Sequence, residues 1–362
     1  MANVLDLRRR IRSVKNTRQI TKAMKMVSAA KLRRAQERTM RARPYARMLT
    51  SVLVSMVRRT DCYDEETGEI LNSLLVEREE KNVLVIVIAG DKGFAGAFNS
   101  NIGKAAQRFM DERSKLGQTI DLEPVGKKAI ALYKKKVAAA NYEKTEQHYD
   151  NELSTHFDVI RHRAQPVEVA AEHATMLLRV DFNDVTEMAR SIIERYERAE
   201  IDSVYIVYNE FKSVISQRVV VEKLLPIRKL GSREITASEE MTEEQKEAAA
   251  RAASTAGVSI QEPEDDSSEA EAKFGTADVD YIFDQPPGHL FRDLLPRYIT
   301  AQIFHSLLES AAAEHAARMT ATDAATKNAG DLIDSLSLTM NRLRQAAITK
   351  EIIEIVSGAA AL

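Results

Sequence analysis

The chain has 362 residues, 44% of them hydrophobic, and its 52 basic residues nearly balance 54 acidic ones. This composition excludes a wholly disordered chain, and the charge balance favours neither a nucleic-acid coat protein nor an acidic tail protein. Low aromatic content, no Trp and plentiful Ala and charged residues indicate long helices rather than a β-sandwich or barrel.

The cysteine content and the length of the apolar runs restrict the cellular compartment in which we expect the protein. Cys62 is the single cysteine, which excludes an internal disulfide framework, a multi-cysteine zinc site and a two-cysteine switch. The longest apolar run, residues 83–89, is far shorter than the roughly 18 residues of a membrane-spanning helix. The first residues contain no apolar stretch of signal-peptide length, so we expect a chain that stays in the cytoplasm.

Residues 1–60 predict a long basic helix. They carry 4 Lys and 13 Arg against Asp6 and Glu37, a net charge of +15. We expect a helix of about 55 residues, roughly 80 Å long, with a bend at Pro44. Its apolar stripe is narrow and needs a partner helix along its length. The stripe has helical spacing at Val4, Leu7, Ile11 and Val14, and continues through Ile20, Met24 and Val27.

Residues 82–226 predict a small α/β domain with Rossmann-like layering. Residues 82–89 form a β-branched run, which is typical of a parallel strand buried on both faces. Strands and helices then alternate along the chain. We expect further strands at 120–125, 203–208 and, as an edge strand, 213–221, and helices at 101–116, 127–138 and 184–198.

Residues 227–280 form an acidic, low-complexity insertion. Between 232 and 280 there are 14 acidic and 4 basic residues, a net charge of −10. Thr242 is a candidate N-cap for a short helix within 239–253, whereas the composition of 232–273 as a whole predicts a mobile, solvated loop.

Residues 287–362 predict a C-terminal coiled-coil helix. Its stretch from 296 to 357 contains no further proline, and Pro296 suits the first helical turn. An Ala-rich zone at 311–329 allows another backbone to approach closely. A heptad seam follows at Ile333, Leu336, Met340, Leu343 and Ala347. The expected fold is therefore α/β plus α: a long antiparallel coiled coil of N- and C-terminal helices with a central Rossmann-like α/β domain.

No motif in the chain indicates catalysis. The glycine loop at 90–96 follows a strand, but it has neither the dinucleotide nor the Walker spacing. The seven histidines have no metal-ligand spacing, so we expect no metal and no cofactor. The residues alone leave several functions open: a nucleotide-binding α/β enzyme, a basic coiled-coil adaptor for nucleic acid or a membrane surface, or a basic helix enclosed by other subunits.

Five segments resemble the gamma subunit of rotary (F-type) ATP synthases, the central stalk of these enzymes. Residues 10–36 are similar to the opening helix of the family, and residues 348–361 (ITKEIIEIVSGAAA) to its C-terminal signature. Residues 294–304 and 317–329 resemble the rest of the C-terminal helix, and residues 93–101 the glycine turn. The acidic insertion departs from the family pattern. The paired cysteines of the redox-regulated photosynthetic subgroup are also missing.

The resemblance implies a noncatalytic rotor subunit that couples proton flow to ATP synthesis. Its implied partners are the alpha and beta subunits of the catalytic ring, the epsilon subunit and the membrane c ring, with no nucleic acid and no membrane span of its own. Its implied location is the cytoplasmic face of the cell membrane, as a peripheral component. The implied coupling contacts are Met24, Lys25, Arg344, Gln345, Thr349 and Glu351, and residues 357–362 would sit in an apolar bearing.

The insertion raises one regulatory hypothesis. Because it is acidic and the coil is basic, it could bind the coil or the ring and impede reverse rotation, which would regulate ATP hydrolysis. A solvated loop without function is the alternative expectation.

Overall fold

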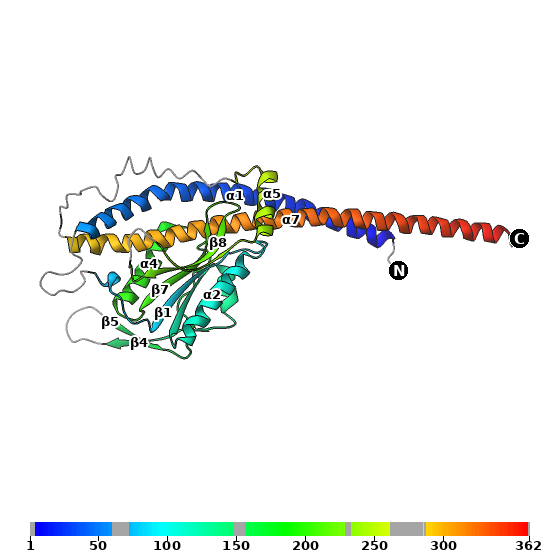
Figure 1. Ribbon diagram of the computed structural model, residues 1–362. Coiled ribbons are helices and arrows are strands. Elements are labelled where there is room, and N and C mark those ends of the chain that lie inside the picture. Colours follow the sequence, from blue (N-terminus) through cyan, green and yellow to red (C-terminus); the bar gives the residue numbers. More distant parts are fainter. Residues whose placement is uncertain are drawn as a thin grey trace.

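The computed structural model describes residues 4–59, 72–147, 156–228, 233–260, 285 and 287–360. Two long helices lie side by side, and an α/β body packs against one half of the pair (Figure 1). Helix α1 spans Val4–Arg59 and helix α7 spans Pro287–Ala360. The fold class expected from the sequence is confirmed. Cys62 lies outside the described residues.

The two helices run antiparallel, and polar contacts fix their register. Lys25 Nζ lies 2.7 Å from Asp323 Oδ1, and Thr326 Oγ1 lies 2.7 Å from Thr21 Oγ1. Continued along the coil, this register brings Val4 level with about residue 344. The last turns of α7 therefore extend past the N-terminal end of α1 (Figure 1).

The seam of the coil agrees only in part with the predicted stripe. Leu7 and Ile11 are buried as expected. Ile20 and Val27, however, are 60% and 56% exposed, so their prediction as seam residues was wrong. At this level α1 presents other side chains to the neighbouring helix, among them Thr21, Lys25 and Ser28. Small and polar residues fit here because the facing part of α7 is rich in Ala and contains Asp323.

The prolines do not mark helix boundaries. Helix α1 is continuous through Pro44, and Pro296 lies inside α7, so the prediction of Pro296 in the first turn was wrong. The turns before it are held by packing, because Phe291 and Leu295 are fully buried in the core. Tertiary burial here outweighs the local preference of proline.

The body is a seven-stranded sheet with the order β3-β6-β2-β1-β7-β8-β9. Strands β3, β6, β2, β1 and β7 are parallel, whereas β8 and β9 pair antiparallel. A separate hairpin, β4 with β5, stands beside it. The strands are β1 Asn82–Ile88, β2 Thr119–Val125, β3 Ala138–Ala139, β4 Asn141–Gln147, β5 His156–His162, β6 Val167–Val169, β7 Ser203–Phe211, β8 Gln217–Leu225 and β9 Glu234–Glu240.

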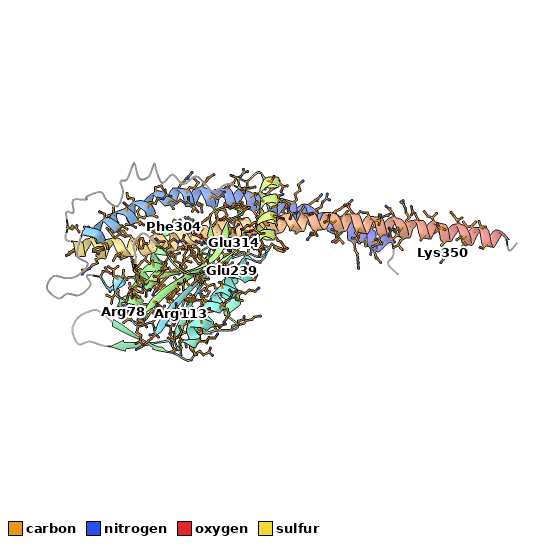
Figure 2. All side chains as sticks on the ribbon, in the orientation of Figure 1. Arg78, Arg113, Glu239, Phe304, Glu314 and Lys350 are labelled. Carbon is orange, nitrogen blue, oxygen red and sulfur yellow. The ribbon has the colours of Figure 1, made fainter. Side chains whose placement is uncertain are left out.

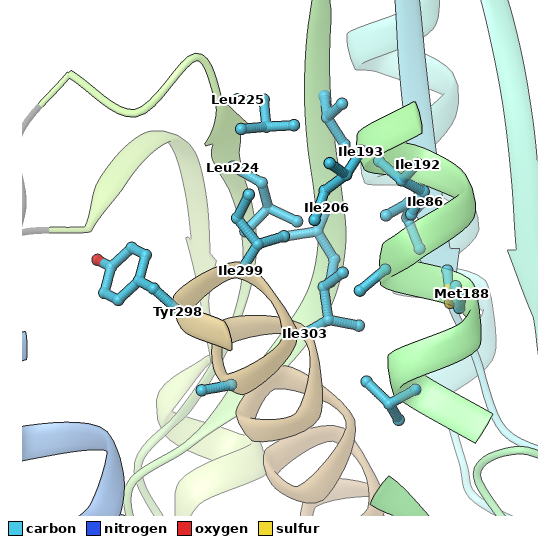
Figure 3. Close-up of a cluster of buried hydrophobic side chains, with 14 of the residues drawn as sticks. Ile86, Met188, Ile192, Ile193, Ile206, Leu224, Leu225, Tyr298, Ile299 and Ile303 are labelled. Carbon is cyan, nitrogen blue, oxygen red and sulfur yellow. The ribbon is translucent and has the colours of Figure 1, made fainter. Parts of the chain in front are cut away.

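Helices cover both faces of the sheet. On one face, Leu84, Ile86 and Ile88 of β1 pack with helix α4 and the first half of α7. Figure 3 shows Ile299 of α7 and Met188 of α4 in this cluster. On the other face, the alternate residues of β1 pack with α2 and α3. The shorter helices are 3-10 helix η1 Ser73–Leu75, α2 Phe98–Lys115, α3 Lys127–Tyr133, α4 Phe182–Glu197 and α5 Glu243–Ala256.

The insertion is the largest correction to the sequence-based fold. Strand β9 adds to the sheet beside β8, and helix α5 follows after a capping box formed by Thr242 and Gln245. The prediction of a solvated loop was therefore wrong for residues 233–260, although a short helix was expected near this position. The rest of the acidic run, residues 261–284, lies outside the described residues.

Buried titratable side chains lie where α7 crosses β7 and β8. Arg233 pairs with Glu210 at 2.8 Å and with Glu222 at 3.0 Å. His305 Nδ1 lies 3.3 Å from Glu309 Oε1. Burial raises the pKa of Glu309 to about 8 and lowers the pKa of His305 to about 4. At pH 7 both groups are therefore mainly neutral, and the Glu309 carboxyl can donate a hydrogen bond to the ring.

We expect the substitution Glu309→Gln to change how stability depends on pH. Burial raises the pKa of the carboxyl from 4.5 to about 8 on folding. The stability that the neutral form contributes is therefore complete below pH 4.5 and is lost as pH rises through 8. Relative to the native chain, Glu309→Gln should gain stability over this interval, on the order of a few kcal/mol, and the gain should then level off.

Urea unfolding of the full chain at a series of pH values measures this difference. The control is Glu247→Gln on the exposed side of α5, which should follow the native pH profile. If both variants follow the native profile, the carboxyl of Glu309 is not neutral in the folded chain.

Candidate functional site

The residues that the sequence indicated as coupling contacts fall in two places on the coil. Met24 and Lys25 lie on α1 beside the α/β body, and Arg344 to Glu351 lie on the end of α7 that projects away from it (Figure 1). The structure does not bring the two groups together. The candidate site is therefore a long surface along one end of the coil.

Lys25 has contacts within its own chain that the sequence did not predict. Only 7% of the residue is exposed. Its Nζ donates to Asp323 Oδ1 on α7 and to Thr255 Oγ1 on α5, both at 2.7 Å. Met24, its neighbour, is partly buried. Lys25 therefore joins three helices of this chain. No sequence pattern near Lys25 indicated Thr255, because 230 residues separate the two positions.

The other four indicated residues lie on the projecting end of α7 and are exposed. Thr349 Oγ1 donates 2.9 Å back to the carbonyl of Gln345, which is a contact within one turn. Lys350, labelled in Figure 2, lies beside them and is 3.5 Å from Glu354. Arg344 and Glu351 present charged groups to the surroundings. This end can thus contact another molecule without any rearrangement of the chain.

The projecting end also carries an apolar stripe that sequence reasoning missed. Ile348, Ile352, Ile355 and Val356 follow helical spacing and are 48% to 71% exposed. The spacing of three and four residues is visible in the sequence, but this stripe lies on a different face of α7 from the predicted seam at Leu343 and Ala347. An exposed apolar surface of this length is typical of a site that contacts another protein or a membrane. The side chains of 358–362, at the predicted bearing, lie outside the described residues.

The glycine loop holds α7 rather than presenting a phosphate site. Arg318 of α7 donates from Nε to the carbonyl of Gly93 at 3.2 Å and from Nη2 to that of Lys92 at 3.4 Å. A Cβ added to Gly90 would lie 2.9 Å from the carboxyl carbon of Glu314, a residue labelled in Figure 2. Gly90 thus allows close approach of α7, and a carboxylate at this position repels phosphate. Nothing here favours the nucleotide-binding alternative.

Within the described part of the chain, no group of three or more His, Cys, Asp and Glu residues is placed to hold a metal ion. His315 lies 3.3 Å from Arg318, and His173 lies 3.3 Å from Glu123, so each of these rings has a partner in the fold. The helices within the described ranges are all too short or too polar to cross a bilayer.

Comparison with known proteins covers the whole chain. A family model described as ATP synthase matches residues 3–362. The ATP synthase gamma chain of Solibacter usitatus (strain Ellin6076) is 43% identical over 361 residues, covering 100% of this chain and 99% of that protein. The ATP synthase gamma chain of Anaeromyxobacter dehalogenans (strain 2CP-C) is 37% identical, with 100% of both chains covered.

A solved structure agrees with this relationship at the level of the fold. The rotor of the Euglena gracilis mitochondrial ATP synthase in rotational state 1 matches with a TM-score of 0.50 and 17% sequence identity. The match covers 95% of this chain and 98% of that one. Because the family model and relatives above 30% identity span the full length, this chain belongs to the ATP synthase gamma-chain family.

Proposed function

We propose that this chain is the noncatalytic central-stalk rotor subunit of a proton-translocating ATP synthase. It couples proton flow through the membrane sector to ATP synthesis in a catalytic ring, and ATP hydrolysis drives it in reverse. The observation that carries this proposal is the projecting end of α7, where an exposed apolar stripe lies on a helix that extends beyond its coil partner. Full-length relatives named ATP synthase gamma chain support it.

The coil can couple its rotation to the conformation of the catalytic subunits because it is asymmetric. Helix α7 reaches beyond α1 (Figure 1), and two helices of different sequence give the coil no rotational symmetry about its axis. Inside a ring with three chemically identical catalytic subunits, each subunit then meets a different surface and is biased toward a different conformation. This bias is a coupling free energy, and it is reciprocal. Rotation of the coil changes nucleotide affinity, and nucleotide binding or release rotates the coil.

The partners follow from this arrangement. The alpha and beta subunits surround the projecting end of the coil, and the α/β body contacts the epsilon subunit and the membrane c ring. The chain is then a peripheral component at the cytoplasmic face of the cell membrane. The contacts to the ring include Arg344, Gln345, Thr349 and Glu351. Met24 and Lys25 can contact the ring only over the part of their surface that α5 does not cover. The ammonium group of Lys25 already binds Thr255 and Asp323 within the chain.

Assembly is the first test of the proposal. An affinity tag on this chain should recover alpha, beta and epsilon subunits and ATPase activity from membranes solubilised in mild detergent. The same preparation should contain no bound nucleic acid. If the tagged chain is recovered alone, or binds ATP by itself in calorimetry at millimolar concentration, the rotor assignment fails.

Substitutions on the projecting end test the contacts one at a time. Arg344→Ala, Thr349→Val and Glu351→Gln should each lower ATP-driven proton pumping in membrane vesicles by about two- to tenfold, because each removes one polar contact to the ring. The unfolding of the isolated chain should not change, since these side chains are exposed. Lys350→Ala, on the same turns, is the matched control for helix propensity. Normal pumping in all three variants would remove these residues from the coupling surface.

A further inference from the structure

Helix α5 of the insertion lies across both helices of the coil, near the place where the coil leaves the α/β body (Figure 1). Its inner face is made of alanines that are almost completely buried, Ala249, Ala252 and Ala253. They pack in one cluster with Ala29 and Leu32 of α1 and with the small residues Ala312, Ala313 and Ala316 of α7. Small side chains let the three helices approach closely.

Polar contacts at the C-terminal end of α5 fix its position on α1. Thr255 Oγ1 accepts from Lys25 Nζ at 2.7 Å, while its own hydroxyl donates to the carbonyl of Arg251 at 2.8 Å. This second bond directs a lone pair of Thr255 at the ammonium group. About two turns further along α1, Arg33 donates to the carbonyl of Gly257. Gly257 ends the helix in the left-handed conformation, with a φ of 65°.

The N-terminal end of α5 is anchored to the sheet. Strand β9 pairs with β8 from Arg218↔Glu240 to Lys223↔Glu234 and is followed at once by the capping box of α5. Residues 234–257 therefore connect the sheet to both helices of the coil. The acidic residues Glu243, Glu244 and Glu247 are exposed, so opposite charge is not what holds α5 in place. Alanine packing and the two polar contacts hold it.

We propose that α5 is a brace that carries torque between the coil and the α/β body, with Thr255 and Arg33 as its positioning residues. The proposal rests on the rotor function above. A load on the projecting end of α7 must be balanced by the body. At the level of Lys25 the seam between α1 and α7 includes the polar side chains of Thr21, Ser28 and Asp323. Here α5 adds a connection between the coil and the body, through Lys25 and Arg33 at one end and strand β9 at the other.

Thr255→Val tests the brace without removing the helix. Valine keeps the shape of threonine and removes the oxygen that accepts from Lys25. In the isolated full-length chain, amide hydrogen exchange of residues 243–256 should become about fivefold faster. Thr255→Ser, which keeps the hydroxyl, and Ser254→Val, which places the same side chain at the exposed neighbouring position, should leave the exchange rate unchanged.

A second measurement uses the assembled complex in membrane vesicles and determines the number of protons pumped per ATP hydrolysed. Thr255→Val should lower this ratio by at least about twofold, because some ATP is hydrolysed without turning the body when the coil slips relative to it. Thr255→Ser should restore the native ratio. A merely structural role would lower pumping and hydrolysis together through loss of protein and leave the ratio unchanged.

Three results overturn the brace: unchanged exchange in Thr255→Val, faster exchange with an unchanged pumping ratio, or faster ATP hydrolysis with unchanged ATP synthesis. The last result identifies α5 as a directional brake. Failure of the rotor function can be distinguished from failure of the brace. If the rotor function is wrong, the native chain assembles with no ATPase. The hydrogen-exchange measurement on the isolated chain still tests how α5 is held.

Discussion

The antiparallel contact between α1 and α7 is the interaction on which the rest of the structure depends. A helix of this length is not held by its own propensities, and its narrow stripe must be covered by another helix. The covering helix comes from the far end of the chain. The segments between α1 and α7 must therefore fold so that the chain leaves one helix of the coil and returns to the other. The α/β sheet meets this condition, because β1 follows α1 and β8 with β9 leads back toward α7.

The seam of the coil changes character along its length, and this change organises the site. Toward the end of the coil the seam is apolar, at Leu7 and Ile11 on α1 and Ile333 on α7. At the level of Lys25 it includes small and polar side chains, and Lys25 forms a close ion pair with Asp323. Such a pair contributes little net stability but fixes the register of the two helices. The extra helix α5 packs against this stretch and adds its buried alanines to it.

The sequence predicted most of what local patterning determines. The run at 82–89 contains β1, and helices were expected at the positions of α2 and α4, because apolar periodicity directly reflects burial of these elements. The predicted helix at 127–138 is shorter, since α3 ends at Tyr133. Strands β3 and β6 were missed because two or three residues are too few to show a period.

Other features depend on contacts between distant parts of the chain and have no local signal. Strand β9 reads EITASEE and is mostly exposed, so nothing in its composition indicates that it pairs with β8. The mixture of Ala and charged residues in α5 is equally compatible with a solvated helix, and only the packing against α1 and α7 gives its alanines a partner. Lys25 belongs to a basic helix, and only the fold shows which carboxylate it meets.

The end of α7 leads to a further consequence. Past the N-terminus of α1 it continues as a single helix, with Ile348, Ile352 and Ile355 open to solvent (Figure 1). An isolated helix of this length is marginal in water, and an uncovered apolar stripe adds to its cost. A partner that covers the stripe also stabilises the helix, because binding to the ordered state shifts the equilibrium toward it. Order at this end and assembly with the ring are therefore one coupled process, and the sequence here is constrained by a surface that the chain itself does not contain.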